Sequence, residues 1–155
     1  MRLVGWRIVQ SRRAKTAFDG EGARLFGGRW NHKGTPVVYT ASSMSLAALE
    51  MLVNLPAPEI LKRYVSIPIE FDDALCIWLD PKSLPRNWRN SPPLIATRDV
   101  GTEWVNKGTS EVLAVPSAVV PAEWNFLINP KHPDSRKVSV GGQQPFKYDP
   151  RLLKT

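Results

Sequence analysis

Glu50 is the residue best placed for chemistry in this 155-residue chain, because it is an isolated charge in an apolar segment. No other charged residue occurs in residues 34–58. At helical spacing Glu50 shares a face with Leu46, Leu49 and Val53, and the helix is apolar nearly all round, which predicts that it is buried. A buried carboxylate is costly unless it is paired or functional. Three interpretations stay open: a structural ion pair, a helix rotated so that Glu50 meets water, or a carboxylate with a functional role.

Residues 27–31, Gly-Gly-Arg-Trp-Asn, form a second candidate. Two glycines allow the backbone to approach a ligand closely, and Arg29 can grip a phosphate or carboxylate with its fork of donors. Trp30 and Tyr39 supply flat rings that can stack on a planar ligand. The alternative is a Gly-Gly turn with an exposed arginine and a core tryptophan.

Ser117 is a polar residue in a stiff, apolar setting rich in proline. A Ser-His-Asp triad with His132 and Asp134 is conceivable. The chain lacks the Gly-x-Ser-x-Gly elbow, however, and a His and an Asp two residues apart rarely converge on one base. The sequence therefore argues against a triad hydrolase.

Several site types have no support in the sequence. Two histidines and the single Cys76 do not have metal-ligand spacing, so no metal is expected. Neither a P-loop nor a Gly-x-Gly-x-x-Gly motif occurs. Six tryptophans and a net charge of +7 would suit a basic nucleic-acid-binding module, but the aromatics are not interleaved with Lys and Arg along adjacent strands. That module remains the non-catalytic alternative.

The elements that must position these residues alternate irregularly between strands and helices. Fourteen prolines and ten glycines argue against a helical bundle. Helices are predicted at about 43–54, capped by Ser42 or Ser43, and at 93–107. Pro68 places its strand at a sheet edge. Strands are predicted at 1–9, 35–40, 64–71, 74–79, 111–115, 125–129, 137–140 and 146–148.

This mixed order predicts an α+β fold, and the length predicts one domain over residues 1–155. Its core is expected at about 3–140, followed by a C-terminal extension at 141–155. The basic segment 11–26 is interpreted as a loop or frayed helix that could form a mobile lid. A lone cysteine, no apolar leader and no membrane span favour a cytoplasmic protein.

These motifs, in this order, resemble the RES-domain family over about residues 3–133. The matching blocks are 6–8 (Trp-Arg-Ile), 26–34 (FGGRWNHKG), 38–41, 47–50, 116–117 and 125–133 (NFLINPKHP).

The resemblance implies the toxin of a bacterial toxin–antitoxin pair. Family members resemble ADP-ribosyltransferase toxins, with two packed mixed or antiparallel sheets, a few helices and an NAD-binding cleft. They deplete NAD⁺, their substrate rather than a bound cofactor, by cleaving its nicotinamide–ribose bond with water or inorganic phosphate as acceptor. The implied partner is an Xre-type helix-turn-helix antitoxin that covers the active site, and a homodimer is possible. Direct nucleic-acid contact is not expected outside that complex.

The resemblance also implies roles for individual residues. Glu50 would stabilise positive charge on the ribose, because breaking an N-glycosidic bond builds charge there. Arg29 and Arg7 would hold the pyrophosphate or the adenosine side, and Tyr39 would stack on nicotinamide or ribose. Ser117 would either bind the ribose or position Glu50.

Asn31 and Asn125 complete the predicted NAD⁺-binding set. The family pattern also leads us to expect an aromatic residue beside Arg7 on the cleft side, where Trp6 precedes it and Ile8 follows. A second enzymatic possibility uses the same residues: transfer of ADP-ribose to a protein or nucleic acid.

Overall fold

The computed structural model describes residues 1–154. Three α-helices occur there: α1 (Glu21–Phe26), α2 (Met44–Asn54) and α3 (Ile95–Lys107). The strands are β1 (Arg2–Gln10), β2 (Val38–Ala41), β3 (Tyr64–Asp72), β4 (Cys76–Trp78), β5 (Val112–Pro116), β6 (Trp124–Ile128), β7 (Ser139–Val140) and β8 (Gln144–Phe146). In the same described range no helix is long and apolar enough to cross a membrane.

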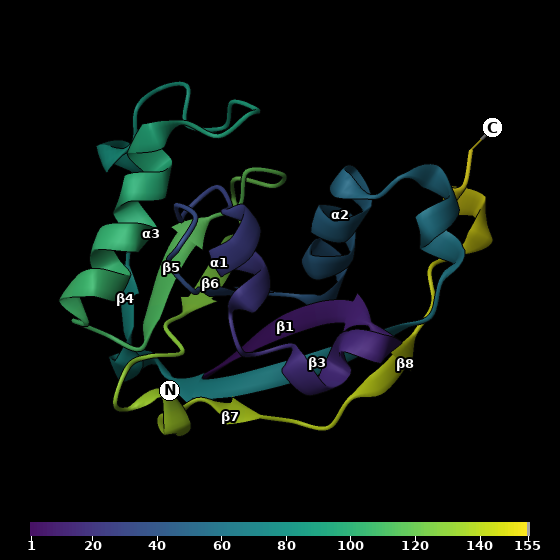
Figure 1. Cartoon of the computed structure of the whole chain (residues 1–155), viewed down its shortest axis with the longest axis horizontal. Helices are drawn as coiled ribbons and strands as arrows, with labels where there is room; N and C mark the ends of the chain where they lie inside the picture. The colour runs from purple at the N-terminus through teal and green to yellow at the C-terminus, as the bar shows by residue number, and fades with distance from the viewer. Residues whose placement is uncertain (155) are drawn as a thin grey trace.

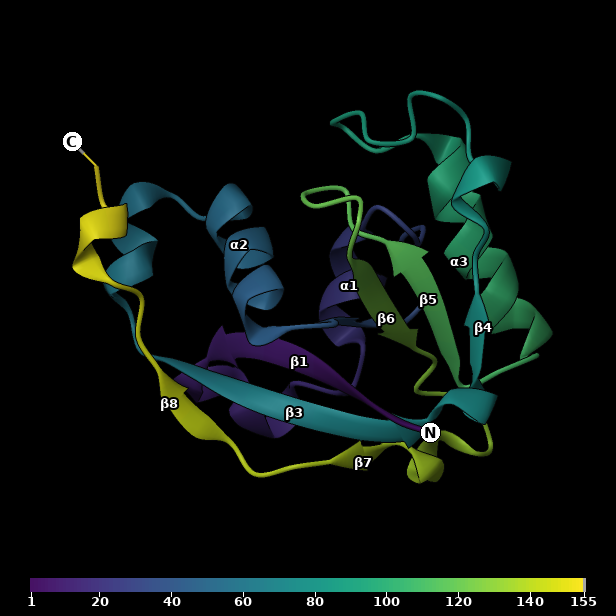
Figure 2. The same cartoon turned by 180° about the vertical axis from the view of Figure 1, so that it is seen from behind.

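The strands form one mixed sheet in the order β4-β5-β6-β2-β1-β3-β7, and β8 also pairs with β3. Its two halves meet at a narrow link, since β1 and β2 share a single register pair, Trp6 with Ala41. Figures 1 and 2 show β1 and β3 running at a steep angle to β4, β5 and β6. The α+β class is confirmed, and the two expected sheets are the hydrogen-bonded halves of one sheet. These halves pack together through Phe71 and Phe126, whose ring centroids lie 5.1 Å apart.

Helix α2 begins and ends where the sequence predicts. The Ser43 hydroxyl accepts a hydrogen bond from the Leu46 amide at 3.1 Å, which caps the first turn. Leu46 is buried against the sheet, whereas Leu49 and Val53 are 44% and 66% exposed. The prediction of a helix buried all round was therefore wrong, because the sheet covers only one side of α2 (Figure 1).

Strand β3 is not the edge strand that Pro68 suggested. It lies between β1 on one side and β7 and β8 on the other. Pro68 falls in the gap between the residues that pair with β8 and those that pair with β7, so its missing N–H interrupts no ladder. Its carbonyl still accepts a hydrogen bond from the Gly141 amide at 2.8 Å.

The C-terminal segment is part of the core rather than an extension. Residues of β8 pair with β3, and Tyr148 is 3% exposed. The Tyr148 hydroxyl donates to the Ala48 carbonyl at 2.7 Å, which ties this segment to α2. Thr155 lies outside the described residues.

Candidate functional site

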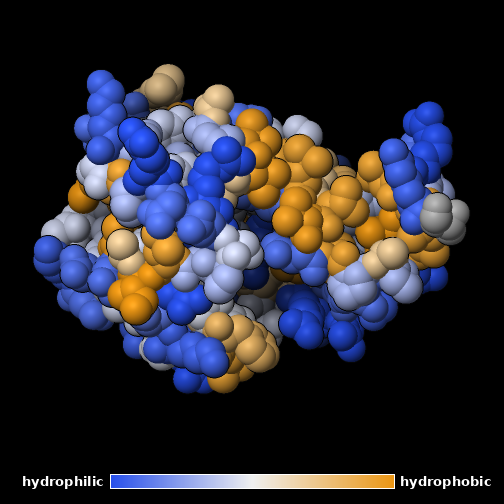
Figure 3. Space-filling view, turned by 90° about the horizontal axis from the view of Figure 1, so that it is seen from above, coloured by the Kyte–Doolittle hydropathy of each residue, from blue (hydrophilic) through white to orange (hydrophobic). Residues whose placement is uncertain are grey.

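A cleft of about 600 Å³ opens between α2 and the loops on the opposite half of the sheet. This volume lies within the range of about 300–1,000 Å³ that is usual for small-molecule sites. Figure 3 shows the hollow beside the apolar side chains that gather over α2. Its lining includes Trp6, Arg7, Ile8, Arg29, Trp30, Tyr39, Glu50, Val53, Arg89, Ser91, Ala118, Val119 and Asn125.

Glu50 points into this cleft from α2, and neutral groups hold its carboxylate. Oε1 accepts a hydrogen bond from Asn125 Nδ2 at 2.7 Å, and Oε2 accepts one from Ser117 Oγ at 3.1 Å. No ion pair within residues 1–154 involves Glu50. Burial raises the pKa of Glu50, and the hydrogen bonds from Asn125 and Ser117 partly oppose this. The structural ion pair is thus absent from the described chain, and the carboxylate can balance a cation brought by a ligand.

Ser117 is completely buried behind Glu50. Its Oγ accepts hydrogen bonds from the amides of Val119 and Val120, both at 3.1 Å, while its own proton is directed to Glu50. A hydroxyl with this set of partners has no free lone pair with which to attack a substrate. The geometry supports the positioning role for Ser117.

The side chains of Tyr39 and Asn31 form a hydrogen-bonded pair under the Gly-Gly turn. The Tyr39 hydroxyl donates to Asn31 Oδ1 at 2.6 Å and accepts from the Trp30 amide at 3.1 Å. Burial raises the pKa of this phenol. Asn31 has no exposed surface, and the two N–H groups of its Nδ2 are shared among three backbone carbonyls at 2.9–3.1 Å. A Cβ at Gly28 would lie 2.7 Å from the Tyr39 hydroxyl oxygen, so the turn needs glycine there.

The ligand contact assigned to Asn31 is therefore corrected. With its oxygen and its amide nitrogen both engaged inside the protein, Asn31 holds the turn that carries Arg29. Asn125, in contrast, lines the cleft and bonds to Glu50 directly. Tyr39 also lines the cleft, although its hydroxyl is engaged by Asn31 and the Trp30 amide.

Arg7 reaches the cleft from β1 and is fixed by backbone oxygens. Its Nε donates to the Ala17 carbonyl at 2.6 Å, and its Nη1 donates to the Tyr39 carbonyl at 2.9 Å. Burial lowers the pKa of this guanidinium. No residue of segment 11–26 lines the cleft, and Ala17 is buried. The segment anchors Arg7 and does not form the lid that the sequence suggested.

Arg29 lines the cleft from the Gly-Gly turn. Its Nη1 donates to the carbonyls of Trp88 and Asn90, both at 2.9 Å. The loop it holds brings Arg89 to the cleft, a residue that the sequence analysis missed. Nothing in its proline-rich surroundings signals a site, and only the long-range contact with Arg29 reveals it. Trp6 and Ile8, on either side of Arg7, both line the cleft.

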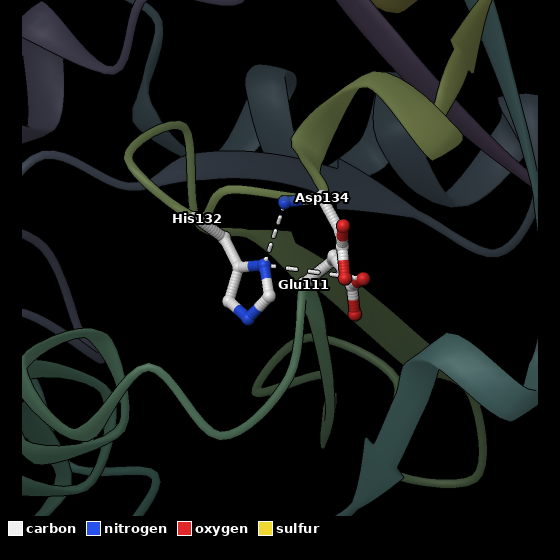
Figure 4. A group of neighbouring side chains, drawn as sticks. All are labelled: Glu111, His132 and Asp134. Carbon is white, nitrogen blue, oxygen red and sulfur yellow. Dashed lines mark hydrogen bonds and ion pairs between the residues drawn. The ribbon is translucent and has the colours of Figure 1, made fainter.

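A separate cluster lies at the start of β5 and consists of Glu111, His132 and Asp134 (Figure 4). His132 Nε2 bonds the Gly108 carbonyl at 3.0 Å, and Nδ1 accepts the Asp134 amide proton at 3.0 Å. Both ring nitrogens are thus engaged, which leaves no lone pair for a metal ion. Ser117 follows the opposite end of β5, so a triad with His132 does not form. The cluster fastens the loop after β6 to the C-terminus of α3.

Fold and site together define an α+β domain in which a buried carboxylate shares a small-molecule cleft with arginines. The chain belongs to the RES domain family, whose pattern matches residues 4–149.

Named relatives agree with this assignment, and a solved structure shares the fold. A protein of Yersinia enterocolitica named Toxin Res is 43% identical over 152 residues, covering 97% of this chain and 99% of the relative. A Sphingobium protein named Prs ADP-ribosylating toxin is 37% identical over 155 residues, covering 96% of both. The fold is similar to a chain of the M. tuberculosis MbcT–MbcA toxin–antitoxin complex, with a TM-score of 0.77, 19% identity, and coverage of 99% of this chain and 87% of that one.

Proposed function

We propose that this protein is the toxin of a toxin–antitoxin pair and that it cleaves the nicotinamide–ribose bond of NAD⁺. The observation that carries the proposal is Glu50, a carboxylate held in the cleft by two neutral donors and paired with no cation in residues 1–154. Such a group suits a reaction in which positive charge develops on the ribose of the substrate. Membership of the RES domain family and relatives named as toxins support the same conclusion.

The geometry suggests how the reaction proceeds. Nicotinamide leaves as a neutral base with the bonding electron pair, and the ribose C1′ becomes an oxocarbenium-like cation. Glu50 stabilises that cation, while Ser117 and Asn125 keep both of its oxygens oriented. The acceptor oxygen then bonds to C1′ and loses its proton. Water gives ADP-ribose, and inorganic phosphate gives ADP-ribose carrying a phosphate on C1′.

Product analysis tests this proposal. Purified protein free of antitoxin is incubated with NAD⁺, with and without inorganic phosphate, and the products are separated by chromatography. We expect nicotinamide release in both samples if water is the acceptor, and only with phosphate if the reaction is a phosphorolysis. A folded protein that releases no nicotinamide in either sample would refute the proposal and favour the basic binding module.

A second candidate is transfer of ADP-ribose to a macromolecule, which the name of the Sphingobium relative favours. That reaction breaks the same bond and needs the same cleft residues. NAD⁺ labelled in its adenylate portion distinguishes the two activities: label fixed on protein or nucleic acid supports transfer, and label found only in small products excludes it.

We also propose that an Xre-type antitoxin covers the cleft and rests on the outer face of α2. Leu49 is 44% exposed on this face and does not line the cleft. We expect Leu49→Lys to weaken antitoxin binding at least about tenfold, because a buried, unpaired charge costs more than about 1.4 kcal/mol. Ile77→Lys is the matched control, since Ile77 is also 44% exposed but lies on β4. Calorimetric titration with the antitoxin measures both variants, and equal affinities would contradict this placement.

A further inference from the structure

The loop that carries Arg89 is clamped on both sides of that residue. Arg29 Nη1 donates to the carbonyl of Trp88, just before Arg89, and to that of Asn90, just after it. The Trp88 ring also packs on Trp30, with centroids 5.9 Å apart and the planes tilted by 38°. Arg29 and Trp30 thus hold the backbone of residues 88–90 in place, and this backbone determines where Arg89 emerges.

Arg89 itself is exposed and lines the cleft. Its Nε donates to the Ala118 carbonyl at 2.9 Å. Ala118 follows Ser117, the residue that bonds to Glu50, so Arg89 is held against the loop that contacts the carboxylate. A guanidinium has five N–H donors, and this contact uses one of them.

The guanidinium groups of Arg29 and Arg89 have no acidic partner within the described residues. No ion pair in the described chain involves Arg29 or Arg89. Burial lowers the pKa of Arg29, and the neighbouring charge of Arg89 lowers it further. Two adjacent cations that face a cleft attract an anion, and the planar fork of arginine matches the oxygens of a phosphoryl group.

We propose that Arg89 binds a phosphoryl group in the cleft and that Arg29 is the positioning residue that fixes the Arg89 loop. This assignment rests on the proposed function, which gives the enzyme two sources of a phosphoryl group. One is the pyrophosphate of NAD⁺, and the other is inorganic phosphate acting as acceptor.

Direct binding tests the site without any turnover. Calorimetric titration of the wild type with inorganic pyrophosphate, and separately with inorganic phosphate, is compared with Arg89→Gln. We expect Arg89→Gln to weaken binding of at least one anion about tenfold, because a hydrogen bond to a charged group contributes about 1.5–3 kcal/mol. The matched control is Arg86→Gln, which removes the same charge from an exposed residue near Arg89 that does not line the cleft, and it should bind as the wild type does. Equal loss in both variants, or none in Arg89→Gln, would overturn the proposal.

Kinetics identify the source of the phosphoryl group. If it is the pyrophosphate, Arg89→Gln raises KM for NAD⁺ by a larger factor than it lowers cleavage of nicotinamide riboside, which has no phosphoryl group. If it is the acceptor, KM for phosphate rises instead. If Arg89→Gln lowers kcat/KM for nicotinamide riboside and for NAD⁺ by the same factor, with KM for phosphate unchanged, the proposal is overturned. A wild type that binds the anions but cleaves no NAD⁺ would refute the proposed function and leave the anion site standing.

Amide hydrogen exchange tests the positioning role of Arg29. Without the clamp, residues 86–91 should exchange faster in Arg29→Gln than in the wild type. Arg89→Gln should raise their exchange less than Arg29→Gln does, because it removes only the bond to Ala118 and Arg29 still holds both carbonyls. Unchanged exchange in Arg29→Gln would show that Arg29 does not hold the loop.

Discussion

Glu50→Gln is expected to lower the rate of nicotinamide release from NAD⁺ by about 10²–10³-fold, the usual loss when one preorganised electrostatic group is removed. The amide keeps the size of the side chain but removes the charge that opposes the oxocarbenium-like cation. Chromatography of nicotinamide over time measures the loss. Glu103→Gln is the matched control, since Glu103 lies exposed on α3 and should keep the wild-type rate. Full activity in folded Glu50→Gln would remove Glu50 from the mechanism.

The pH dependence of the rate gives a second test of the charge on Glu50. Only ionised Glu50 stabilises the cation, and burial raises its pKa above the ordinary 4.5. The rate should therefore fall with decreasing pH, with a midpoint above 4.5. Ser117→Ala removes a hydrogen bond that lowers this pKa, so it should move the midpoint to higher pH. An unchanged midpoint in Ser117→Ala would contradict its positioning role.

Gly101→Ala is expected to lower the free energy of unfolding by about 1–3 kcal/mol, the usual range for overpacking. Gly101 lies in α3, where a Cβ would overlap the backbone carbonyl oxygen of Trp30. Neither helix nor turn can move freely, because Trp30 belongs to the turn that Asn31 and Tyr39 hold together. Urea denaturation followed by circular dichroism measures the change.

Gly22→Ala provides the control for this substitution. Gly22 lies in α1, and a Cβ there would meet no atom within 4 Å. Alanine should therefore leave stability unchanged or raise it by up to about 1 kcal/mol through helix propensity. Equal stability of Gly101→Ala and the wild type would show that the contact between α3 and the turn relaxes at no cost.

Local signals in the sequence were sufficient to locate most elements and several cleft residues. Helix α2 follows from its serine cap and the proline after it, and α3 from the glycine that ends it, whose φ is 61°. Both rest on interactions within a few residues, which a sequence displays directly. Glu50 stands out for a similar reason, because a lone charge in an apolar segment is visible without any partner.

The sequence by itself thus determined the α+β class, the family and the prominence of Glu50 and Arg29. Only the tertiary structure decided that α2 has an exposed face, that Asn31 supports the turn from behind, and that Arg89 reaches the cleft. The hydrogen bonds responsible join residues far apart in the chain: 67 positions separate Glu50 from Ser117, and 59 separate Arg29 from Trp88. Such contacts depend on how the two halves of the sheet fold together, and no local pattern of residues records that geometry.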